Sequence, residues 1–208
     1  MDEVSPENNE ESYKIITLGD SAVGKTSIIQ RFVFDDFNPD QLSSLGISHS
    51  FRVLNINQKK IKLNLIDTNG QEKYRSLSVS YFKHVDVVLF IFDLNLEDSF
   101  DNIQYWIDLF KENEDIKNIK GKYLIGNKSD LEQKVKQELI DELVKKNGLI
   151  YMSTSAKTKS QIDEMFEYIA AELYEYSKNH ENDKKGKNTK KEKILLKGND
   201  EKTRRCCS

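Results

Sequence analysis

The sequence predicts an α/β fold built on a six-stranded, mostly parallel sheet with helices on both faces. Short apolar runs that suit buried strands alternate along residues 13–177 with longer segments of helical periodicity. Such alternation is typical of a parallel sheet that helices cover on both faces. The chain has 208 residues, of which 37% are hydrophobic, and this is enough for one domain with a substantial core and an appendage.

The expected elements follow one another in a regular order. Apolar runs predict strands at 13–18, 62–66, 85–92, 122–126 and 149–153. Helical patterns occupy 25–34, 99–113, 136–147 and 161–177. The stretch from about 47 to 66 differs, because it reads as a hairpin whose turn is NINQKK. In this layout ligands bind at the carboxyl ends of the strands.

The two ends of the chain have compositions unlike that of the domain. Residues 1–12 are acidic and polar, lack the features of a secretory signal and are expected to be disordered. Residues 178–208 carry 11 Lys and Arg against 5 Asp and Glu, have no aromatic residue and are expected to form a flexible basic tail. Residues 13–177 form the predicted domain. With an overall charge of −3, residues 1–177 carry −9, which argues against nucleic-acid binding.

The motif GDSAVGKT, residues 19–26, follows the first strand and precedes the first helix. Gly19 and Gly24 permit a tight backbone path whose N–H groups point into a phosphate-sized hollow, and the helix N-terminus adds a positive dipole. Lys25 is placed to reach the outer phosphates and Thr26 to offer its hydroxyl to Mg²⁺. A purely structural glycine turn is the alternative. The nucleotide contacts expected here are Ser21, Ala22, Val23, Gly24, Lys25, Thr26 and Ser27.

A second motif, DTNGQE, begins at Asp67 at the end of the third strand. Asp67 is placed to hold Mg²⁺ through water. The N–H of Gly70 can face a γ-phosphate, and Gln71 is the expected catalytic residue, because it is placed to orient an attacking water. By itself, a pattern this short fits any turn.

Two further motifs, NKSD at 127–130 and TSAK at 154–157, follow the fifth and sixth strands. The Asp130 carboxylate can accept two hydrogen bonds from guanine, whereas adenine offers no such pair and would leave a buried carboxylate unpaired. The TSAK backbone can face the guanine carbonyl. Each motif alone also fits a plain polar loop. The base contacts expected from the two motifs are Asn127, Lys128, Asp130, Ser155, Ala156 and Lys157.

Taken together, the four motifs resemble those of the small GTPases, and within them the Rab family. The resemblance covers 13–177 and includes the segments KYRSL, YFKHV and FDLN. It implies the P-loop NTPase G-domain fold, GTP and GDP as ligands, and Mg²⁺ as cofactor. It also implies that Ser44 replaces the first-switch threonine that ligates Mg²⁺, and that Phe37 packs on the guanine.

The sequence departs from the Rab pattern in both switch segments. The first-switch pattern reads SLGISH at 44–49, and Asn69 stands where the family has alanine. Rabs present a surface trio of Phe, Trp and Tyr to effectors, and its positions hold His49, Ile66 and Tyr81 here. The identity of its effectors therefore cannot be inferred from those of familiar Rabs.

The sequence ends in CCS, which contains its only two cysteines, Cys206 and Cys207. This ending resembles the paired-cysteine ends of Rabs, which take two geranylgeranyl groups. Two lipid chains, or one plus basic residues, anchor a protein stably to a membrane. The alternative is that the lysine-rich tail is only a solvated end.

The resemblance implies a membrane-attached GTP/GDP switch in vesicle trafficking that hydrolyses GTP slowly. The implied partners are an exchange factor, a GTPase-activating protein, escort and GDP-dissociation-inhibitor proteins, effectors and the membrane, without nucleic acid. The implied location is the cytoplasmic face of intracellular membranes, with a cytosolic inhibitor-bound pool. The alternatives are a Rab-like binding module with negligible hydrolysis and, more remotely, a nucleotide kinase or ATP-driven enzyme.

Overall fold

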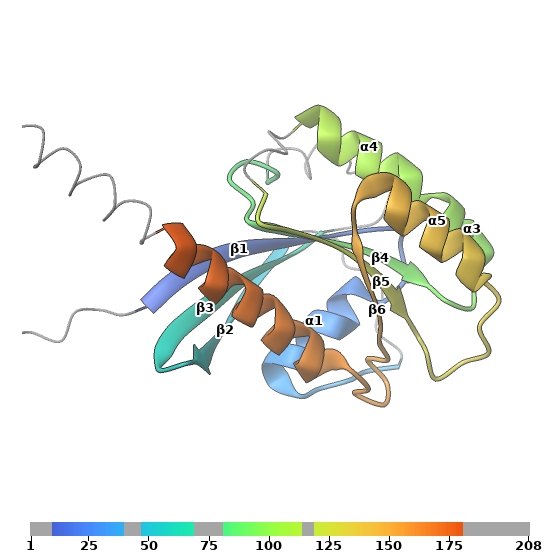
Figure 1. Cartoon of the computed structure of the whole chain (residues 1–208). Helices are drawn as coiled ribbons and strands as arrows, with labels where there is room; N and C mark the ends of the chain where they lie inside the picture. The colour runs from blue at the N-terminus through green and yellow to red at the C-terminus, as the bar shows by residue number, and fades with distance from the viewer. Residues whose placement is uncertain (1–9, 40–46, 69–80, 114–118, 181–208) are drawn as a thin grey trace, which may run out of the picture. The chain divides into compact units, whose positions relative to one another are not determined.

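Six strands form one sheet in the order β2-β3-β1-β4-β5-β6 in the computed structural model, which describes residues 10–39, 47–68, 81–113 and 119–180 (Figure 1). The strands are β1 (Glu10–Leu18), β2 (Ser48–Ile56), β3 (Lys59–Asp67), β4 (Val87–Asp93), β5 (Gly121–Asn127) and β6 (Ile150–Ser153). Neighbouring strands run parallel except β2, which pairs antiparallel with β3. This confirms the predicted α/β class with a mostly parallel sheet.

Helices cover both faces of this sheet. The labelled helices are α1 (Lys25–Phe34), α3 (Glu97–Asp101), α4 (Ile103–Asn113) and α5 (Gln137–Asn147). Figure 1 shows α1 on the opposite face from α4 and α5. On the α1 face, Phe32 stacks on Phe166 with ring centroids 3.9 Å apart. On the other face, Phe90 of β4 meets Phe110 of α4 edge to face, so each face has its own apolar layer.

The turn between β2 and β3 has the geometry of a two-residue hairpin. Ile56 pairs with Lys59, and the intervening Asn57 and Gln58 both have positive φ, at 48° and 68°. Two left-handed residues match the right-handed twist of the flanking strands. The predicted hairpin with its turn in NINQKK is therefore present.

Some elements differ in extent from the sequence-based expectation. β1 begins at Glu10 rather than at residue 13, and Glu11 forms an ion pair with Lys59 of β3 at 2.6 Å. The helix expected at 99–113 is two helices, α3 and α4, that meet at Asn102. A hydrophobic pattern cannot reveal either feature, because polar residues carry both.

Contacts within the chain divide it after Ala170. Residues 162–170 are helical and belong to the first unit. In the second unit the described residues, 171–180, are also helical and continue past the expected end at 177. There the His180 ring stacks on Tyr176 at 4.1 Å, and its Nδ1 lies 3.0 Å from the Tyr176 carbonyl. Across the described ranges, no helix is both long and apolar enough to cross a membrane.

The parallel strands bring the four motifs to one edge of the sheet. GDSAVGKT follows β1, DTNGQE begins with the last residue of β3, NKSD begins with the last residue of β5, and TSAK follows β6. Because these four strands run in the same direction, their carboxyl ends lie at the same edge. This is the edge at which ligands bind in sheets of this kind.

Candidate functional site

Residues 19–26, here named the phosphate loop, follow a path that only glycine can take at two points. Gly19 has φ +147° and Gly24 has φ +99°. A Cβ on Gly19 would lie 2.1 Å from the Ile91 carbonyl oxygen, and one on Gly24 would lie 2.2 Å from Nδ2 of Asn127. Neighbouring groups thus approach the loop so closely that a side chain cannot fit. Ser21, Ala22 and Val23 lie between the two glycines, and Ser27 lies in the first turn of α1.

Lys25 is the first residue of α1, and its side chain is buried. Its Nζ donates hydrogen bonds to the carbonyls of Gly19 at 3.0 Å and Asp20 at 2.6 Å. Burial lowers the pKa of Lys25 to about 8, against the opposing effect of the nearby Asp67 and Asp20 carboxylates. A buried ammonium that carbonyl dipoles hold at the start of a helix favours an anionic ligand.

A hydroxyl and a carboxylate meet beside this lysine. Thr26 Oγ1 donates to Asp67 Oδ2 at 2.6 Å, and Asp67 is 1% exposed. The pair joins the first turn of α1 to the end of β3. Hydroxyl and carboxylate oxygens are the ligands that Mg²⁺ prefers, so these residues fit the cofactor that the sequence predicts.

Asn127, the last residue of β5, connects the phosphate loop to TSAK. Its Nδ2 donates to the Val23 carbonyl at 2.8 Å. Its Oδ1 accepts from the backbone N–H of Ala156 at 3.3 Å and from Thr154 Oγ1 at 3.4 Å. Asn127 is 1% exposed, so each of these bonds is protected from water and fixes the distance between the two loops.

Asp130 is held by the loop that follows β6. Ser155 Oγ donates to Asp130 Oδ1 at 2.5 Å, and Lys157 Nζ lies 3.8 Å from Oδ2. Lys128, with φ +62°, points elsewhere and pairs with Asp93 Oδ2 at 2.7 Å. The NKSD and TSAK loops therefore form one hydrogen-bonded unit that presents a carboxylate.

Comparison of the sequence with known proteins shows the family of this chain. A sequence model of the Ras family matches residues 14–175. The Ras-related protein Rab-13 of Bos taurus is 37% identical over 163 residues, which are 77% of this chain and 79% of that protein. Rab-13 of Mesocricetus auratus is 35% identical over 198 residues, which are 94% of this chain and 95% of that protein. Rab-2B of Dictyostelium discoideum is 39% identical over 162 residues, which are 76% of this chain and 78% of that protein. The chain belongs to the Rab family of small GTPases.

Several residues predicted for this Rab-family site lie outside the described residues. They are Ser44, Gly70 and Gln71, together with the divergent Asn69 and the two cysteines, Cys206 and Cys207. Phe37 is described and half-buried, and the Arg31 Cζ lies 5.7 Å from its ring centroid. The structure thus brings together the predicted residues of the phosphate loop, Asp67, and the predicted residues of the NKSD and TSAK loops.

The three positions of the Rab surface trio lie close together. His49 pairs directly across the strands with Ile66, and its ring centroid is 5.5 Å from that of Tyr81. However, Ile66 is only 3% exposed and belongs to the apolar cluster that contains Phe82 and Val85. Within the trio, His49 is therefore exposed, whereas Tyr81 is partly buried and packs against the same cluster.

Sequence reasoning assigned no role to Asp20, which secures the phosphate loop to α4 and to the junction between α3 and α4. Its carboxylate accepts from Nε1 of Trp106 at 2.8 Å and from Nδ2 of Asn102 at 2.7 Å. Asp93 likewise had no assigned role, although it pairs with Lys128. Asp20 lies within the motif GDSAVGKT and Asp93 within the Rab-like segment FDLN, and this was the available signal.

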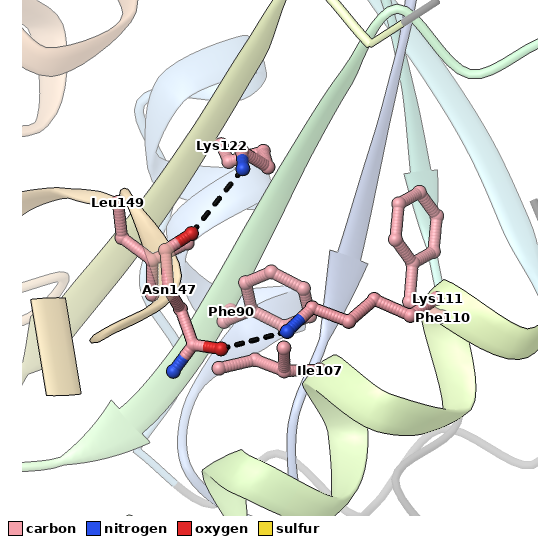
Figure 2. A pocket seen from close by; sticks show the side chains of 7 residues that line it. All are labelled: Phe90, Ile107, Phe110, Lys111, Lys122, Asn147 and Leu149. Carbon is pink, nitrogen blue, oxygen red and sulfur yellow. Dashed lines mark hydrogen bonds between the residues drawn. The ribbon is translucent and has the colours of Figure 1, made fainter. Parts of the chain in front are cut away.

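A small cavity lies apart from the motif loops (Figure 2). It is lined by Phe90, Ile107, Phe110, Lys111, Lys122, Asn147 and Leu149, and its volume is about 10 Å³. Lys111 Nζ donates to Asn147 Oδ1 at 2.8 Å and Lys122 Nζ to the Asn147 carbonyl at 3.2 Å (Figure 2). A space of this size holds about one water molecule, so it is not the nucleotide site.

Proposed function

We propose that this Rab-family protein is a GTP- and GDP-dependent switch that binds guanine nucleotide with Mg²⁺ across the phosphate loop, NKSD and TSAK. The observation that carries the proposal is the double engagement of Asn127 with the Val23 carbonyl and the Ala156 N–H. Through this one buried side chain, a loop suited to phosphates and a loop suited to a purine are held at a fixed separation.

The phosphate end of the nucleotide would lie over the start of α1. The backbone N–H groups of residues 21–27 and the Lys25 ammonium would bind the phosphate oxygens. Thr26 and Asp67 would hold Mg²⁺ there, together with Ser44. When bound, Mg²⁺ neutralises charge on the outer phosphates.

The base end of the nucleotide would meet Asp130. Its carboxylate, oriented by Ser155 at 2.5 Å, suits the two adjacent donors of guanine. Adenine offers no such pair of donors, and the lost hydrogen bonds would cost about 1–3 kcal/mol. The TSAK backbone would face the guanine carbonyl, Asn127 and Lys128 would border the base, and Phe37 would pack on its ring.

Hydrolysis is expected to be slow without a partner. Gln71 would orient the attacking water. Gly70 and Ser44 would contact the γ-phosphate and would lose that contact on hydrolysis. The described residues include two arginines, and both are held by other groups. Arg31 donates to the Ala156 carbonyl at 2.9 Å, and Arg52 donates to Asp163 at 2.9 Å. This supports the proposal that an activator must supply the charge that stabilises the transition state.

The remaining proposals concern membranes and partners. Geranylgeranyl groups on Cys206 and Cys207 would attach the switch to the cytoplasmic face of intracellular membranes, where it would regulate vesicle trafficking. An exchange factor and an activating protein would set its nucleotide state, effectors would read that state, and a GDP-dissociation inhibitor would hold a cytosolic pool.

Single-turnover hydrolysis of bound GTP tests the proposed enzyme. The wild-type protein should release phosphate slowly in the presence of Mg²⁺, and Gln71→Leu should slow both intrinsic and activator-stimulated release. If the wild-type protein binds GTP tightly but releases no phosphate, even with an activating protein, it is a nucleotide-dependent binding module instead.

A further inference from the structure

One side chain, Arg31, joins the helix of the phosphate loop to the TSAK loop. Its Nε donates to the carbonyl of Ala156 at 2.9 Å, and one terminal nitrogen donates to the carbonyl of Lys157 at 3.3 Å. Its other terminal nitrogen donates to the carbonyl of Asp35 at 2.9 Å. The side chain is 16% exposed, and the bond from Nε to Ala156 is the most shielded of the three.

The guanidinium also lies beside the segment that leads away from α1. Its Cζ is 5.7 Å from the centroid of the Phe37 ring, within the range of a cation–π contact. Arg31 stands five residues after Thr26 on the same helix. A rigid element therefore connects the phosphate-binding turn to the group that holds Phe37 and TSAK.

These contacts require the shape of arginine. A planar guanidinium has five N–H donors in a fixed fork, and here that fork serves three carbonyls from two separate loops. A lysine ammonium on a flexible stem would keep the charge but would not hold the same three acceptors with fixed directions.

We propose that Arg31 is a positioning residue for guanine recognition: it fixes the TSAK loop and Phe37 around the base and thereby increases the selectivity of the site for guanine. The inference rests on the proposed function. It acts through Ser155, which is adjacent to Ala156 and donates to Asp130 at 2.5 Å. If the loop moves, Asp130 loses the partner that orients it toward guanine.

The ratio of the affinities for GDP and inosine diphosphate measures this effect. The two nucleotides differ only in the exocyclic amine of guanine, which would donate a hydrogen bond to Asp130 and which inosine lacks. In Arg31→Ala we expect GDP affinity to fall about tenfold and inosine diphosphate affinity about threefold, so that their ratio falls about threefold. Arg31→Lys should lie between Arg31→Ala and the wild type. A general loss of protein stability would weaken the binding of both nucleotides equally, because their phosphates and ribose are the same.

Arg52→Ala is the matched control. Arg52 donates to the carbonyl of Phe32, which lies on α1 as Arg31 does, and to Asp163. Its Cζ lies 4.5 Å from the centroid of the Phe32 ring. None of these contacts reaches TSAK, so the ratio should stay at the wild-type value.

Three outcomes would overturn the inference. In the first, Arg31→Ala keeps the wild-type ratio, or, if that variant does not fold, Arg31→Lys keeps it. In the second, Arg52→Ala lowers the ratio as much as Arg31→Ala. In the third, the wild-type protein binds ADP as tightly as GDP, which would overturn the proposed function as well.

Discussion

At the scale of single residues, Asp20 shows how a side chain outside the expected contacts can support the site. Its carbonyl accepts from Lys25, while its carboxylate accepts from Trp106 and Asn102. Trp106 is 1% exposed, so its indole N–H has no ready access to water if this acceptor is lost. An unpaired buried donor costs about 1–3 kcal/mol.

Asp20→Ala should therefore lower the free energy of unfolding by about 1–3 kcal/mol. Asp20→Asn keeps one acceptor oxygen and should cost less. Urea unfolding in excess GDP checks both variants, and fluorescence can follow it, because Trp106 is the one tryptophan in the sequence. Equal stability of the Ala variant and the wild type would show that the indole contact contributes nothing.

Motif spacing predicted Lys25, Thr26, Asp67, Asn127 and Asp130 as neighbours, because the residues that contact a shared ligand follow strands whose ends meet. It could not predict the contacts of Arg31. The pattern QRF within α1 reads as an ordinary half-exposed helix face, and the two TSAK carbonyls that accept from Arg31 lie 125 and 126 residues away. Only the packed fold brings them together.

At the scale of elements, two glycines bound two helices with left-handed backbone. Gly24, with φ +99°, precedes α1, and Gly148, with φ +61°, ends α5. Their surroundings differ. A Cβ at Gly24 would lie 2.2 Å from the Asn127 amide, whereas the nearest atom to one at Gly148 is Lys122 Nζ at 3.9 Å.

This difference makes Gly148→Ala the control for Gly24→Ala. Both variants carry the strain of a left-handed alanine, about 1–2 kcal/mol. Gly24→Ala must also displace Asn127 from the Val23 carbonyl, so we expect GDP affinity to fall by about 3 kcal/mol, or more than a hundredfold. Gly148→Ala should lower stability but leave GDP affinity unchanged. Equal GDP affinities in the two variants would remove the role assigned to the Gly24–Asn127 contact.

The order of the elements was predictable, since apolar strands and amphipathic helices alternate in the sequence. The exact first and last residues of the helices and strands were less predictable. The expected helix at 99–113 divides into α3 and α4 at Asn102, whose side-chain amide donates to the Asp20 carboxylate, as the indole of Trp106 also does. These contacts are polar and therefore leave no mark in a hydrophobic pattern.

At the scale of the whole molecule, the sequence separates the basic tail and the two cysteines from the four motifs. Residues 178–208 carry a net charge of +6 and the two cysteines, whereas the remainder carries −9. A single prenyl chain binds a membrane reversibly, and two chains make escape slow. The proposed switch would thus bind nucleotide in one part of the sequence and membrane in another.

Substitution of both Cys206 and Cys207 by Ser should leave a protein that stays in the soluble fraction and binds GTP normally. Either single change should weaken or misdirect membrane attachment. Cell fractionation, together with the intact mass of the protein from its own cells, checks this. A double variant that remains on membranes, or an unmodified wild-type C-terminus, would show that CCS is not the anchor.

The central claim is that Asp130 makes this a guanine-nucleotide site, and competition binding tests it most directly. Displacement of a fluorescent GDP from the full chain by GDP and by ADP should show a preference for GDP of several kcal/mol. In Asp130→Asn that preference should collapse, because guanine's two donors then meet an amide. Equal affinity of the wild-type protein for GDP and ADP, or an unchanged preference in Asp130→Asn, would contradict the account.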